Sequence, residues 1–538
     1  MPYVATQQEP EVKRQSTIFV LVSKIDPSSQ PVLFFPYPAA VQLERQCPAG
    51  YEGKRTVRNA HIRLYFTNSC HCRTKRFLYN AITNSLRATS VRKTASSNTW
   101  NIFWGEHLKT QEFAALLPFQ RVNHFPGSFE LGRKDRLCSH LLRMRKKHPN
   151  AYADIIPETY LTANDYDKQQ FLTRFHAEPN VVWILKPPNL SCGRGIKLVS
   201  SSTHPTPKLS KKKAYVAQRY VANPFLIHGL KFDLRVYVVV TSYDPLCIYL
   251  FNDGLVRFCT EKYSTSKSAL QNPFGHLTNY SINKKNAAAF QKNQDTQDEL
   301  HTLSSSKWSL QMLFKYLRDQ DKTRDLENFQ QALEDLIVKT LIAVEDKLSS
   351  ACSRNAFELY GFDVLIEGEN LKPCLLEVNI FPSLSSSSLM DKRIKTVLVS
   401  DLFQLVGIPF VHAKKETQQL DKAKQDRLHG IKQPGATRMI LQKENEAQRR
   451  RRIFDALSRS ANSVTMSQLS DEDLQLVKEV EEELHRCGHF KRIFPTAQAF
   501  DKYSELFDSL RYRNLLCMRW LQHTNQDGGR RLPLTLKK

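Results

Sequence analysis

One stretch, Phe357–Ser383 (FELYGFDVLIEGENLKPCLLEVNIFPS), constrains the fold more than any other part of the chain. Leu359–Ile366 is rich in aromatic and β-branched residues, and Cys374–Val378 is almost wholly apolar. Gly368–Asn370, between them, has the composition of a tight turn. The pattern predicts a buried β-hairpin.

Two acids, Asp363 and Glu377, interrupt the apolar sequence of this hairpin. Folding back about the turn brings them roughly opposite each other, and Asn379 shares the face of Glu377 because side chains alternate along a strand. Buried carboxylates without partners are costly, so the pair implies a cation. Oxygen ligands of this kind suit Mg²⁺ bound together with nucleotide phosphates. The hairpin alone leaves open the alternative that the acids pair with nearby Arg or Lys.

A second informative stretch is Val181–Ser200 (VVWILKPPNLSCGRGIKLVS). A predicted strand ends in Lys186, a loop containing Gly193 and Gly195 follows, and a second strand begins at Ile196. The loop matches neither the Walker A motif nor the dinucleotide-binding fingerprint. It fits a glycine loop between antiparallel strands whose N–H groups bind phosphates, with Lys186 adding a positive charge. By itself, Gly-x-Gly also describes an ordinary turn.

Polar residues also alternate at the start of a strand that continues as VYVVV. Lys231, Asp233 and Arg235 are spaced two apart, so they share one strand face, which is unusual for plain core. Further along, Thr278–Ser281 is a run of hydrogen-bonding side chains.

Another hairpin is predicted immediately after this strand. Ile248–Phe251 and Val256–Phe258 flank Asn252–Gly254, which has turn composition, and Arg257 then lies on the return strand.

The remaining chain alternates predicted strands and helices. Further strands are predicted at Ser16–Ile25, Val57–Phe66, Trp100–Trp104 and Tyr215–Tyr220. Apolar periodicity predicts helices in the second half of 122–150, at Trp308–Leu317, Leu326–Leu348 and Asp391–Leu405, and within 466–522.

The net charge of +25 is the compositional outlier, and it predicts an anionic partner. Residues 412–452 are rich in Lys, Arg and Gln and are predicted to be a basic linker or a solvated helix. Eleven scattered cysteines favour a reducing, intracellular compartment over a disulfide framework. The N-terminus lacks the apolar segment of a signal peptide, and no apolar run approaches the ~20 residues of a membrane helix.

Several of these motifs together resemble the tubulin tyrosine ligase-like family, and its tubulin polyglutamylase branch in particular. The resemblance rests on VNHFPGSFELGRKDRL, on Lys186 with SCGRGI, and on KFDLR, HLTNYSINK, and GFD before LLEVN, in the family's order. It covers roughly residues 18–410 and continues to about 522.

The resemblance implies an α/β (α+β) chain with an ATP-grasp fold, in which antiparallel sheets enclose ATP. A small α/β N-terminal domain would precede this fold, and a basic helical extension would follow it. The expected divisions are a disordered segment 1–16, an N-terminal domain 17–115, ATP-grasp subdomains 116–215 and 216–410, a basic linker or microtubule-binding segment 411–460, a helical region 461–522 and a disordered tail 523–538.

The implied activity is that of a tubulin polyglutamylase, an ATP-dependent ligase that forms isopeptide bonds. ATP would phosphorylate the γ-carboxylate of a glutamate in a tubulin tail, and the amine of free glutamate would attack the acyl-phosphate. Such chemistry needs Mg²⁺ and cationic groups more than a covalent nucleophile. The alternatives are a glycine or tyrosine ligase of the same fold, or a non-catalytic microtubule-binding protein.

The family's site residues carry over position by position. Mg²⁺ would be held by Asp363, Glu377 and Asn379, and Arg235 and Glu377 would be catalytic. The residues expected to contact ATP are Lys186, Cys192, Gly193, Arg194, Gly195, Ile196, Gln218, Arg219, Tyr220, Val221, Lys231, Phe232, Asp233, Thr278 and Asn279. The residues expected to hold the incoming amino acid are Arg257, Tyr280, Ser281, Lys307 and Lys395. Without the resemblance, the favoured interpretation is that Arg257 is an ordinary surface charge, Tyr280 a core residue and Lys395 part of a solvated helix face.

Two positions depart from the family pattern. Cys192 stands where the family often has Arg or Gln, at a position expected to meet the acceptor protein, which leaves initiation versus elongation open. Phe381 precedes Pro382-Ser383 where the family usually continues with Ser-Pro-Ser.

The resemblance also implies partners and a location. The expected partners are acidic tubulin tails on microtubules, free glutamate and ATP, with no nucleic acid and no membrane, and the enzyme is expected to be a monomer. The expected location is the cytoplasm and cytoskeleton, with the cilium or basal body as a further site.

Overall fold

The computed structural model describes most of the chain. The described residues are 18–56, 63–65, 79–89, 91–94, 100–191, 193–210, 213–286, 306–321, 325–349, 355–428 and 436–526.

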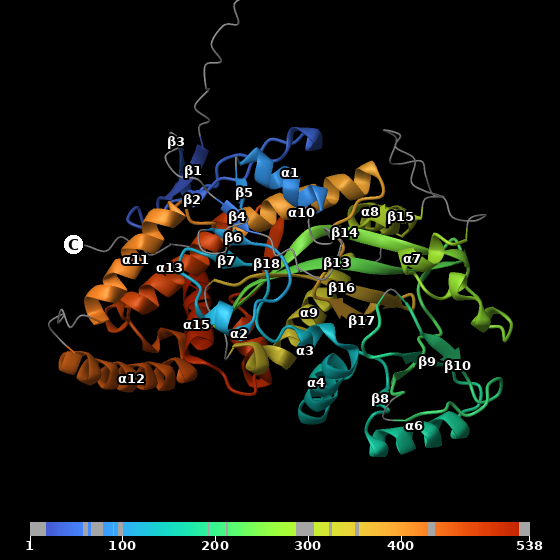
Figure 1. Ribbon diagram of the computed structural model, residues 1–538. Helices are drawn as coiled ribbons and strands as arrows, with labels where there is room; N and C mark the ends of the chain where they lie inside the picture. Colours follow the sequence, from blue (N-terminus) through green and yellow to red (C-terminus); the bar gives the residue numbers. More distant parts are fainter. Residues whose placement is uncertain are drawn as a thin grey trace, which may run out of the picture.

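A central sheet, antiparallel in every described pairing, organises the molecule (Figure 1). Its main path within the described residues is β15-β14-β13-β16-β17, with β12 beside β13 and β18 beside β14. The strands are β12 (Leu226–Ile227), β13 (Leu230–Tyr243), β14 (Leu246–Lys262), β15 (Lys307–Ser309), β16 (Glu358–Glu367), β17 (Lys372–Asn379) and β18 (Phe490–Phe494).

Each face of the central sheet is covered by a separate apolar core. On β13, Val236, Val238 and Val240 pack with the long helix α9, whereas Tyr237 and Val239 pack with helix α10. This division follows the alternation of side chains along a strand. Lys231, Asp233 and Arg235 have the same parity as Tyr237, so they lie on the α10 side of the sheet.

A smaller antiparallel sheet lies beside the central sheet and carries the glycine loop. Its order is β10-β9-β11-β8, and helix α6 covers it at the lower edge of the view in Figure 1. The strands are β8 (Thr159–Leu161), β9 (Trp183–Lys186), β10 (Lys197–Val199) and β11 (Val216–Arg219).

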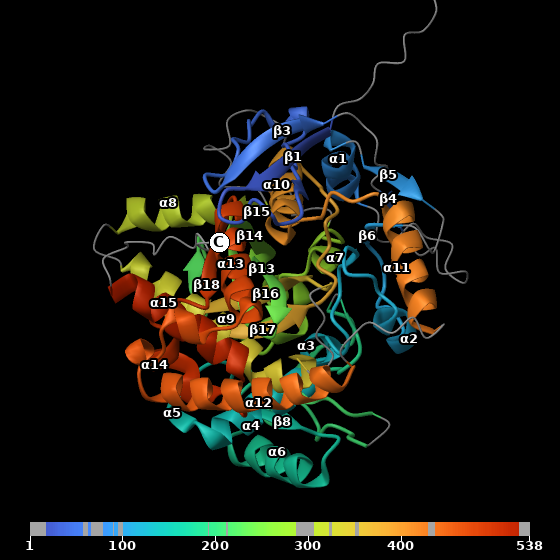
Figure 2. The same cartoon turned by 90° about the vertical axis from the view of Figure 1, so that its left-hand side faces the viewer.

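The N-terminal part forms two further small sheets. An antiparallel sheet has the order β2-β1-β3, and a parallel sheet has the order β5-β4-β6-β7. The strands are β1 (Ile18–Ser23), β2 (Val32–Leu33), β3 (Tyr51–Thr56), β4 (Arg63–Tyr65), β5 (Arg92–Thr94), β6 (Ile102–Phe103) and β7 (Arg121–Val122). Ile18 and Ile102 share one core with helices α10 and α13, so distant segments of the chain pack together near the top of Figure 2.

Helices surround these sheets. Those before the central sheet are α1 (Asn80–Ala88), α2 (Thr110–Ala114), α3 (Phe129–Gly132), α4 (Lys134–Lys147), α5 (Pro149–Tyr152) and α6 (Asp165–Ala177). Those within or after it are α7 (Tyr280–Asn283), α8 (Leu310–Gln320), α9 (Leu326–Ser349), α10 (Leu389–Val406), α11 (Ala413–Leu428), α12 (Ala436–Arg459), α13 (Asp471–Arg486), α14 (Ala499–Tyr503) and α15 (Tyr512–Gln526). Of the described helices, none is long and apolar enough to cross a membrane.

The predicted hairpin at Phe357–Ser383 is confirmed as β16 and β17. The predicted strands around the glycine loop and at Lys231–Val240 are confirmed, as are helices within 122–150 and 326–348 and at 391–405. Of the alternatives for 412–452, the described parts are helical, in α11 and α12.

The second predicted hairpin is wrong. Asn252–Gly254 is not a turn, because β14 continues through it and both halves of β14 pair with β13. The hairpin instead joins β13 to β14 at Asp244-Pro245. Gly254 faces Val236 at an irregularity in the pairing, and the Asp253 carboxylate accepts hydrogen bonds from the first N–H groups of α8, 2.9 Å from Leu310 N. The apparent turn composition therefore serves a bulge and a helix cap.

Replacing Gly254 with Ala is expected to destabilise the protein by about 1–3 kcal/mol, a typical cost of overpacking. An added Cβ would lie 2.6 Å from the backbone oxygen of Arg235, which a central strand cannot move away. Chemical denaturation of the two proteins measures the difference. The exposed neighbour offers a control, since Asn252→Ala should leave the denaturation midpoint unchanged, and equal midpoints for both variants would contradict the bulge explanation.

Smaller differences concern single elements. Trp308 lies in strand β15 instead of the predicted helix, and Phe490–Phe494 is a strand within the region predicted to be helical. Strand β3 was not predicted, and α15 extends to Gln526, beyond the predicted end near 522. The predicted strand at Val57–Phe66 is described only at Arg63–Tyr65, and the expectations for 1–16 and 527–538 fall outside the described residues.

Candidate active site

Strand register aligns charged side chains in a row across the central sheet. Lys307 on β15 pairs with Arg257 on β14, which pairs with Asp233 on β13. Two residues further along β13, Arg235 pairs with Asp363 on β16. Asp363 in turn lies directly opposite Glu377 on β17. From one edge of the sheet to the other, the row consists of Lys307, Arg257, Asp233, Arg235, Asp363 and Glu377.

Asp363 contacts both arginines of this row and is 2% exposed. Its two carboxylate oxygens accept hydrogen bonds from Arg235 Nε and Nη2 at 2.5 and 3.1 Å, and Arg257 Nη2 lies 2.9 Å away. Burial alone would raise the pKa of Asp363, but the guanidinium groups of Arg235 and Arg257 outweigh it and hold this pKa well below its ordinary value. The carboxylate is therefore ionised at any physiological pH.

A second ion pair fixes Arg257. Its Nε and Nη2 each donate to Asp233 at 2.6 Å, and the Thr278 hydroxyl donates to the same carboxylate at 2.5 Å. Arg257 is thus shared by two buried carboxylates, a geometry that suits the planar fork of guanidinium.

A bulge in the hairpin turns two adjacent residues of β17 toward the same side. Asp363 pairs with Glu377, but Val364 already pairs with Leu375, so Leu376 is the extra residue. Leu376 and Glu377 both line the pocket described below, whereas Leu375 and Val378 lie in the core with α9. The Glu377 carboxylate is 2.9 Å from the Lys134 ammonium, which also donates to Leu190 O at 3.1 Å.

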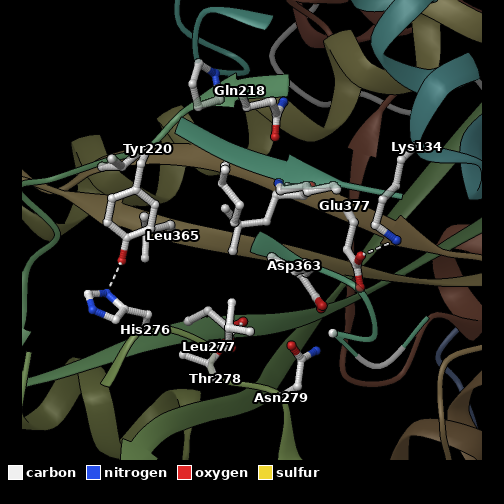
Figure 3. A pocket seen from close by; sticks show the side chains of 18 of the residues that line it. Lys134, Gln218, Tyr220, His276, Leu277, Thr278, Asn279, Asp363, Leu365 and Glu377 are labelled. Atoms are coloured by element: carbon white, nitrogen blue, oxygen red, sulfur yellow. Dashed lines mark hydrogen bonds and ion pairs between the residues drawn. The ribbon is translucent and has the colours of Figure 1, made fainter. Parts of the chain in front are cut away.

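A pocket lies between the smaller sheet and the central sheet. Figure 3 shows Tyr220 and His276 on one side of the pocket and Lys134 and Glu377 on the other, with Asp363 pointing into the space between them. Two antiparallel sheets therefore enclose a space with an apolar interior and a charged end.

Two buried lysines reach the pocket from opposite sheets. Lys186, at the end of β9, donates to Leu376 O at 3.4 Å, and Lys231 donates to the Tyr220 hydroxyl at 2.8 Å. Burial is the main influence on both side chains and lowers their pKa values. An ammonium group that lacks a full anionic partner in such a place is suited to a phosphate.

A cationic cluster continues the charged row beyond Arg257. Lys307 lies over the ring of Tyr280, 4.3 Å from its centre, and its ammonium is 3.3 Å from Asp391. Lys395 lies 2.7 Å from the other oxygen of Asp391. Arg257, Lys307, Lys395 and Tyr280 are therefore gathered at one end of the row, and Ser281 follows Tyr280 in α7.

The structure brings most of the residues predicted to contact ATP to the one pocket. Those that line it are Lys186, Gly193, Ile196, Gln218, Arg219, Tyr220, Val221, Lys231, Asp233, Thr278 and Asn279, together with Asp363 and Glu377.

Others do not line the pocket. Phe232 packs in the core beside Phe225 and Phe258, because it faces the opposite side of β13 from Lys231. The Arg194 side chain bends back to Ser191, and Gly195 also lies off the lining. Cys192 falls outside the described residues.

The oxygen donors at the charged end have the chemistry that Mg²⁺ prefers. Asp363 and Glu377 are opposite each other, and Asn379 follows on β17 with its amide N–H donating to Gly361 O at 3.2 Å. The three residues therefore fit the predicted metal, with Lys134, Arg235 and Arg257 balancing the carboxylates in its absence.

A different trio, His107, His124 and Glu358, also brings potential metal ligands within 4.8 Å of one another. The two imidazole rings are stacked, with centres 4.4 Å apart and planes inclined by 22°, so their in-plane lone pairs do not converge. Glu358 instead accepts hydrogen bonds from His124 Nδ1 and Phe125 N at 2.7 and 3.1 Å. His124 and Glu358 therefore form a buried hydrogen-bonded pair, on which the half-buried His107 stacks. Phe381 packs beside them, with its ring centre 4.3 Å from that of His124.

Three site residues were missed in the sequence. Lys134 lies within the region 122–150, whose second half is predicted to be a helix, and nothing in the surrounding sequence distinguishes it from the neighbouring cations. His276 lines the pocket, and its Nδ1 forms a hydrogen bond of 2.9 Å with the Tyr220 hydroxyl. Asp391 could have been found, since it precedes Lys395 by four residues, the spacing of ion pairs on a helix.

The chain is also similar to known proteins. The model of the tubulin-tyrosine ligase family matches residues 112–418, which is more than half of the chain. The chain is 34% identical to tubulin monoglutamylase TTLL4 of Homo sapiens, over 84% of this chain and 37% of that protein. It is 36% identical to tubulin polyglutamylase TTLL5 of Mus musculus, over 77% of this chain and 31% of that protein. Tubulin polyglutamylase ttll-4 of Caenorhabditis briggsae is 34% identical, over 83% of this chain and 72% of that protein. The chain thus spans about a third of the two mammalian relatives.

Proposed function

The chain belongs to the tubulin-tyrosine ligase family, and on that premise we propose that it is an ATP-dependent glutamate ligase acting on the acidic tails of tubulin. The observation that carries this proposal is the continuous charged row, which joins the pocket between the sheets to the Arg257–Lys307–Lys395 cluster. A nucleotide in the pocket and an amino acid at the cluster would then be adjacent.

The pocket side of the row supplies the nucleotide site. Gln218–Val221, at the end of β11, would contact the adenine, and the N–H groups near Gly193 with Lys186 would bind the phosphates. Asp363, Glu377 and Asn379 would hold Mg²⁺, which when bound neutralises charge on the phosphates.

Arg235 is positioned for the phosphoryl transfer. Asp363 holds its guanidinium through two hydrogen bonds, and the remaining N–H groups of the fork are available to the transferring phosphate. In the proposed reaction, the γ-phosphoryl group passes to the γ-carboxylate of a tail glutamate, which gives an acyl-phosphate and ADP. The unprotonated amine of free glutamate attacks the acyl carbon, a C–N bond forms, the bond to phosphate breaks, and the amine loses a proton.

The cationic cluster favours glutamate over the alternatives. Free glutamate carries two carboxylates, and Arg257, Lys307 and Lys395 offer three cations for them. Glycine or tyrosine carries one carboxylate, so a ligase for either would need fewer. A non-catalytic microtubule-binding protein would not need this arrangement.

Incubation with tubulin, ATP and labelled glutamate, glycine or tyrosine in parallel reactions tests the proposal. Mass spectrometry of the tubulin tails should find glutamate on tail glutamates and neither of the other two amino acids. Incorporation of glycine or tyrosine alone would show that the chain is a ligase for that amino acid instead. If none of the three amino acids is incorporated, the proposed function is refuted.

The apparent affinity for glutamate is expected to fall as pH rises through about 8. Burial lowers the pKa of Lys395 to about 8, so its ammonium charge is present below that pH and is lost above it. The KM for glutamate, measured at saturating ATP between pH 6.5 and 9, should therefore increase across this range while the KM for ATP changes less. A flat KM for glutamate would contradict the placement of Lys395 at the substrate.

The basic segment 411–460 is the proposed contact with the microtubule surface, and the proposed setting is the cytoskeleton in the cytoplasm, including cilia or basal bodies. On α12, Arg449 and Arg450 already form ion pairs with Asp473 and Glu472 at 2.9 and 2.7 Å. Arg451 and Arg452 are exposed, which supports them as the part of this segment that meets an acidic surface.

A further inference from the structure

Asp391 is a fully buried carboxylate shared by two lysines from different elements. It lies in the first turn of α10 and is 0% exposed. Lys395, one turn along the same helix, is 2.7 Å from Oδ1, and Lys307, at the start of β15, is 3.3 Å from Oδ2. Both lysines are themselves more than nine-tenths buried. The carboxylate therefore fixes the separation of two ammonium groups that belong to separate segments of the fold.

The serine-rich segment before α10 folds around the same carboxylate. Ser387 donates to Asp391 Oδ2 from its backbone N at 3.0 Å and from its hydroxyl at 3.2 Å, and that hydroxyl accepts from Lys307 Nζ at 2.8 Å. Ser385 O accepts from Lys395 Nζ at 2.5 Å. This segment connects the end of β17, where Asn379 lies, to α10. Asp391 thus holds together the Lys307 ammonium, which comes from β15 of the central sheet, and the Lys395 ammonium, which comes from α10.

The charges explain why a carboxylate is needed here. Two buried ammonium groups beside Arg257 would repel one another and lose their hydration. Burial lowers the pKa values of Lys307 and Lys395, and Asp391 counteracts that effect for both. Burial would raise the pKa of Asp391 itself, but the two ammonium groups outweigh it, so the carboxylate stays ionised. Lys307, Lys395 and Asp391 together retain one net positive charge, which suits one incoming carboxylate.

We propose that Asp391 is a positioning residue for the incoming amino acid. Asp391 holds the ammonium groups of Lys307 and Lys395 side by side, so that together they bind one carboxylate of that amino acid. The inference rests on the proposed glutamate ligase function, and it assigns the recognition of a dicarboxylic amino acid to a group that does not touch it. Asp391 would act through the two lysines and leave the nucleotide pocket unaffected.

The test is Asp391→Asn in the full chain, assayed for incorporation into tubulin. Asn keeps the shape and removes the charge, so the KM for glutamate should rise at least about tenfold, and the KM for ATP should stay within about twofold. The rise of the glutamate KM with pH should move to lower pH, because Lys395 loses the anion that helps to keep it protonated. A merely structural role would move neither the pH profile nor the ratio of the two KM values.

A matched control lies on the same helix. Asp401 is also 0% exposed, but it binds Tyr37 and His489 far from the charged row. Asp401→Asn should lower stability without changing the KM for glutamate. If Asp391→Asn behaves like Asp401→Asn, the proposal is overturned.

A second variant covers the case in which Asp391→Asn does not fold. Ser387→Ala removes one hydroxyl that contacts both Asp391 and Lys307, and it should raise the KM for glutamate about threefold. An unchanged KM would again overturn the proposal. The two possible failures have different results. If the proposed function is wrong, the wild-type enzyme incorporates no glutamate at all. If only this inference is wrong, the wild-type enzyme incorporates glutamate and the variants have the same KM for glutamate as the wild type.

Discussion

Glu377→Gln is expected to reduce ATP-dependent glutamate incorporation by about a thousandfold or more, since charge stabilisation of this kind dominates phosphoryl transfer. Gln keeps the size of the side chain and removes one of the two carboxylates opposite each other on the hairpin. The proposed Mg²⁺ site would lose an anionic oxygen ligand, and Lys134 would lose its ion-pair partner. Steady-state incorporation of labelled glutamate into tubulin measures the effect.

The folded state and the binding of microtubules should survive this substitution. The Lys134–Glu377 pair is partly exposed, at 13% and 22%, so its loss is expected to cost less than about 1 kcal/mol. Glu367→Gln is the matched control, because Glu367 lies on the same hairpin outside the pocket and pairs in register with Lys372. Near-normal incorporation by the Glu377 variant would refute the enzyme interpretation.

Asp363→Ala is expected to have a different signature, with the loss of activity accompanied by a loss of about 3–5 kcal/mol in the free energy of unfolding. Asp363 is buried and takes hydrogen bonds from Arg235 while Arg257 lies 2.9 Å away. Removing it leaves the Arg235 guanidinium without its carboxylate in the interior. Arg257 keeps Asp233 and is less affected.

Urea denaturation of wild type, Asp363→Ala and Glu377→Gln distinguishes the two carboxylates. The midpoint should fall strongly for Asp363→Ala and little for Glu377→Gln. Equal midpoints would show that the ion pairs of Asp363 do not stabilise the folded protein more than those of Glu377, whatever the part of Asp363 in catalysis.

Much of the site could be predicted from local sequence. The hairpin around Gly368–Asn370, with Asp363 opposite Glu377, follows from strand alternation and a turn signal, and the register confirms both. The shared face of Lys231, Asp233 and Arg235 needed no tertiary information either, because these residues lie on one regular strand.

Local sequence failed where a motif has two structural uses. Asn252–Gly254 has the composition of a turn, but the residues of β14 on both sides of it pair with β13. The Asp253 carboxylate accepts a hydrogen bond from the N-terminus of α8. Pairing with a central strand satisfies more backbone groups than a turn at this position would. The family resemblance predicted that Phe232 contacts the nucleotide, but alternation along β13 directs its side chain into the core.

The hairpin, the glycine loop and the charged strand face could be predicted because each depends on residues close together in the chain. Which cation pairs with which anion depends on the folded structure. Lys134 reaches Glu377 from α4, and Asp391 joins Lys307 to Lys395, through contacts between segments that the chain separates by many residues. Such pairings depend on strand register and helix packing, which buried area and hydrogen bonding fix across the whole fold. The carboxylates that appeared in the hairpin as a cation site are therefore one end of a row that spans the sheet.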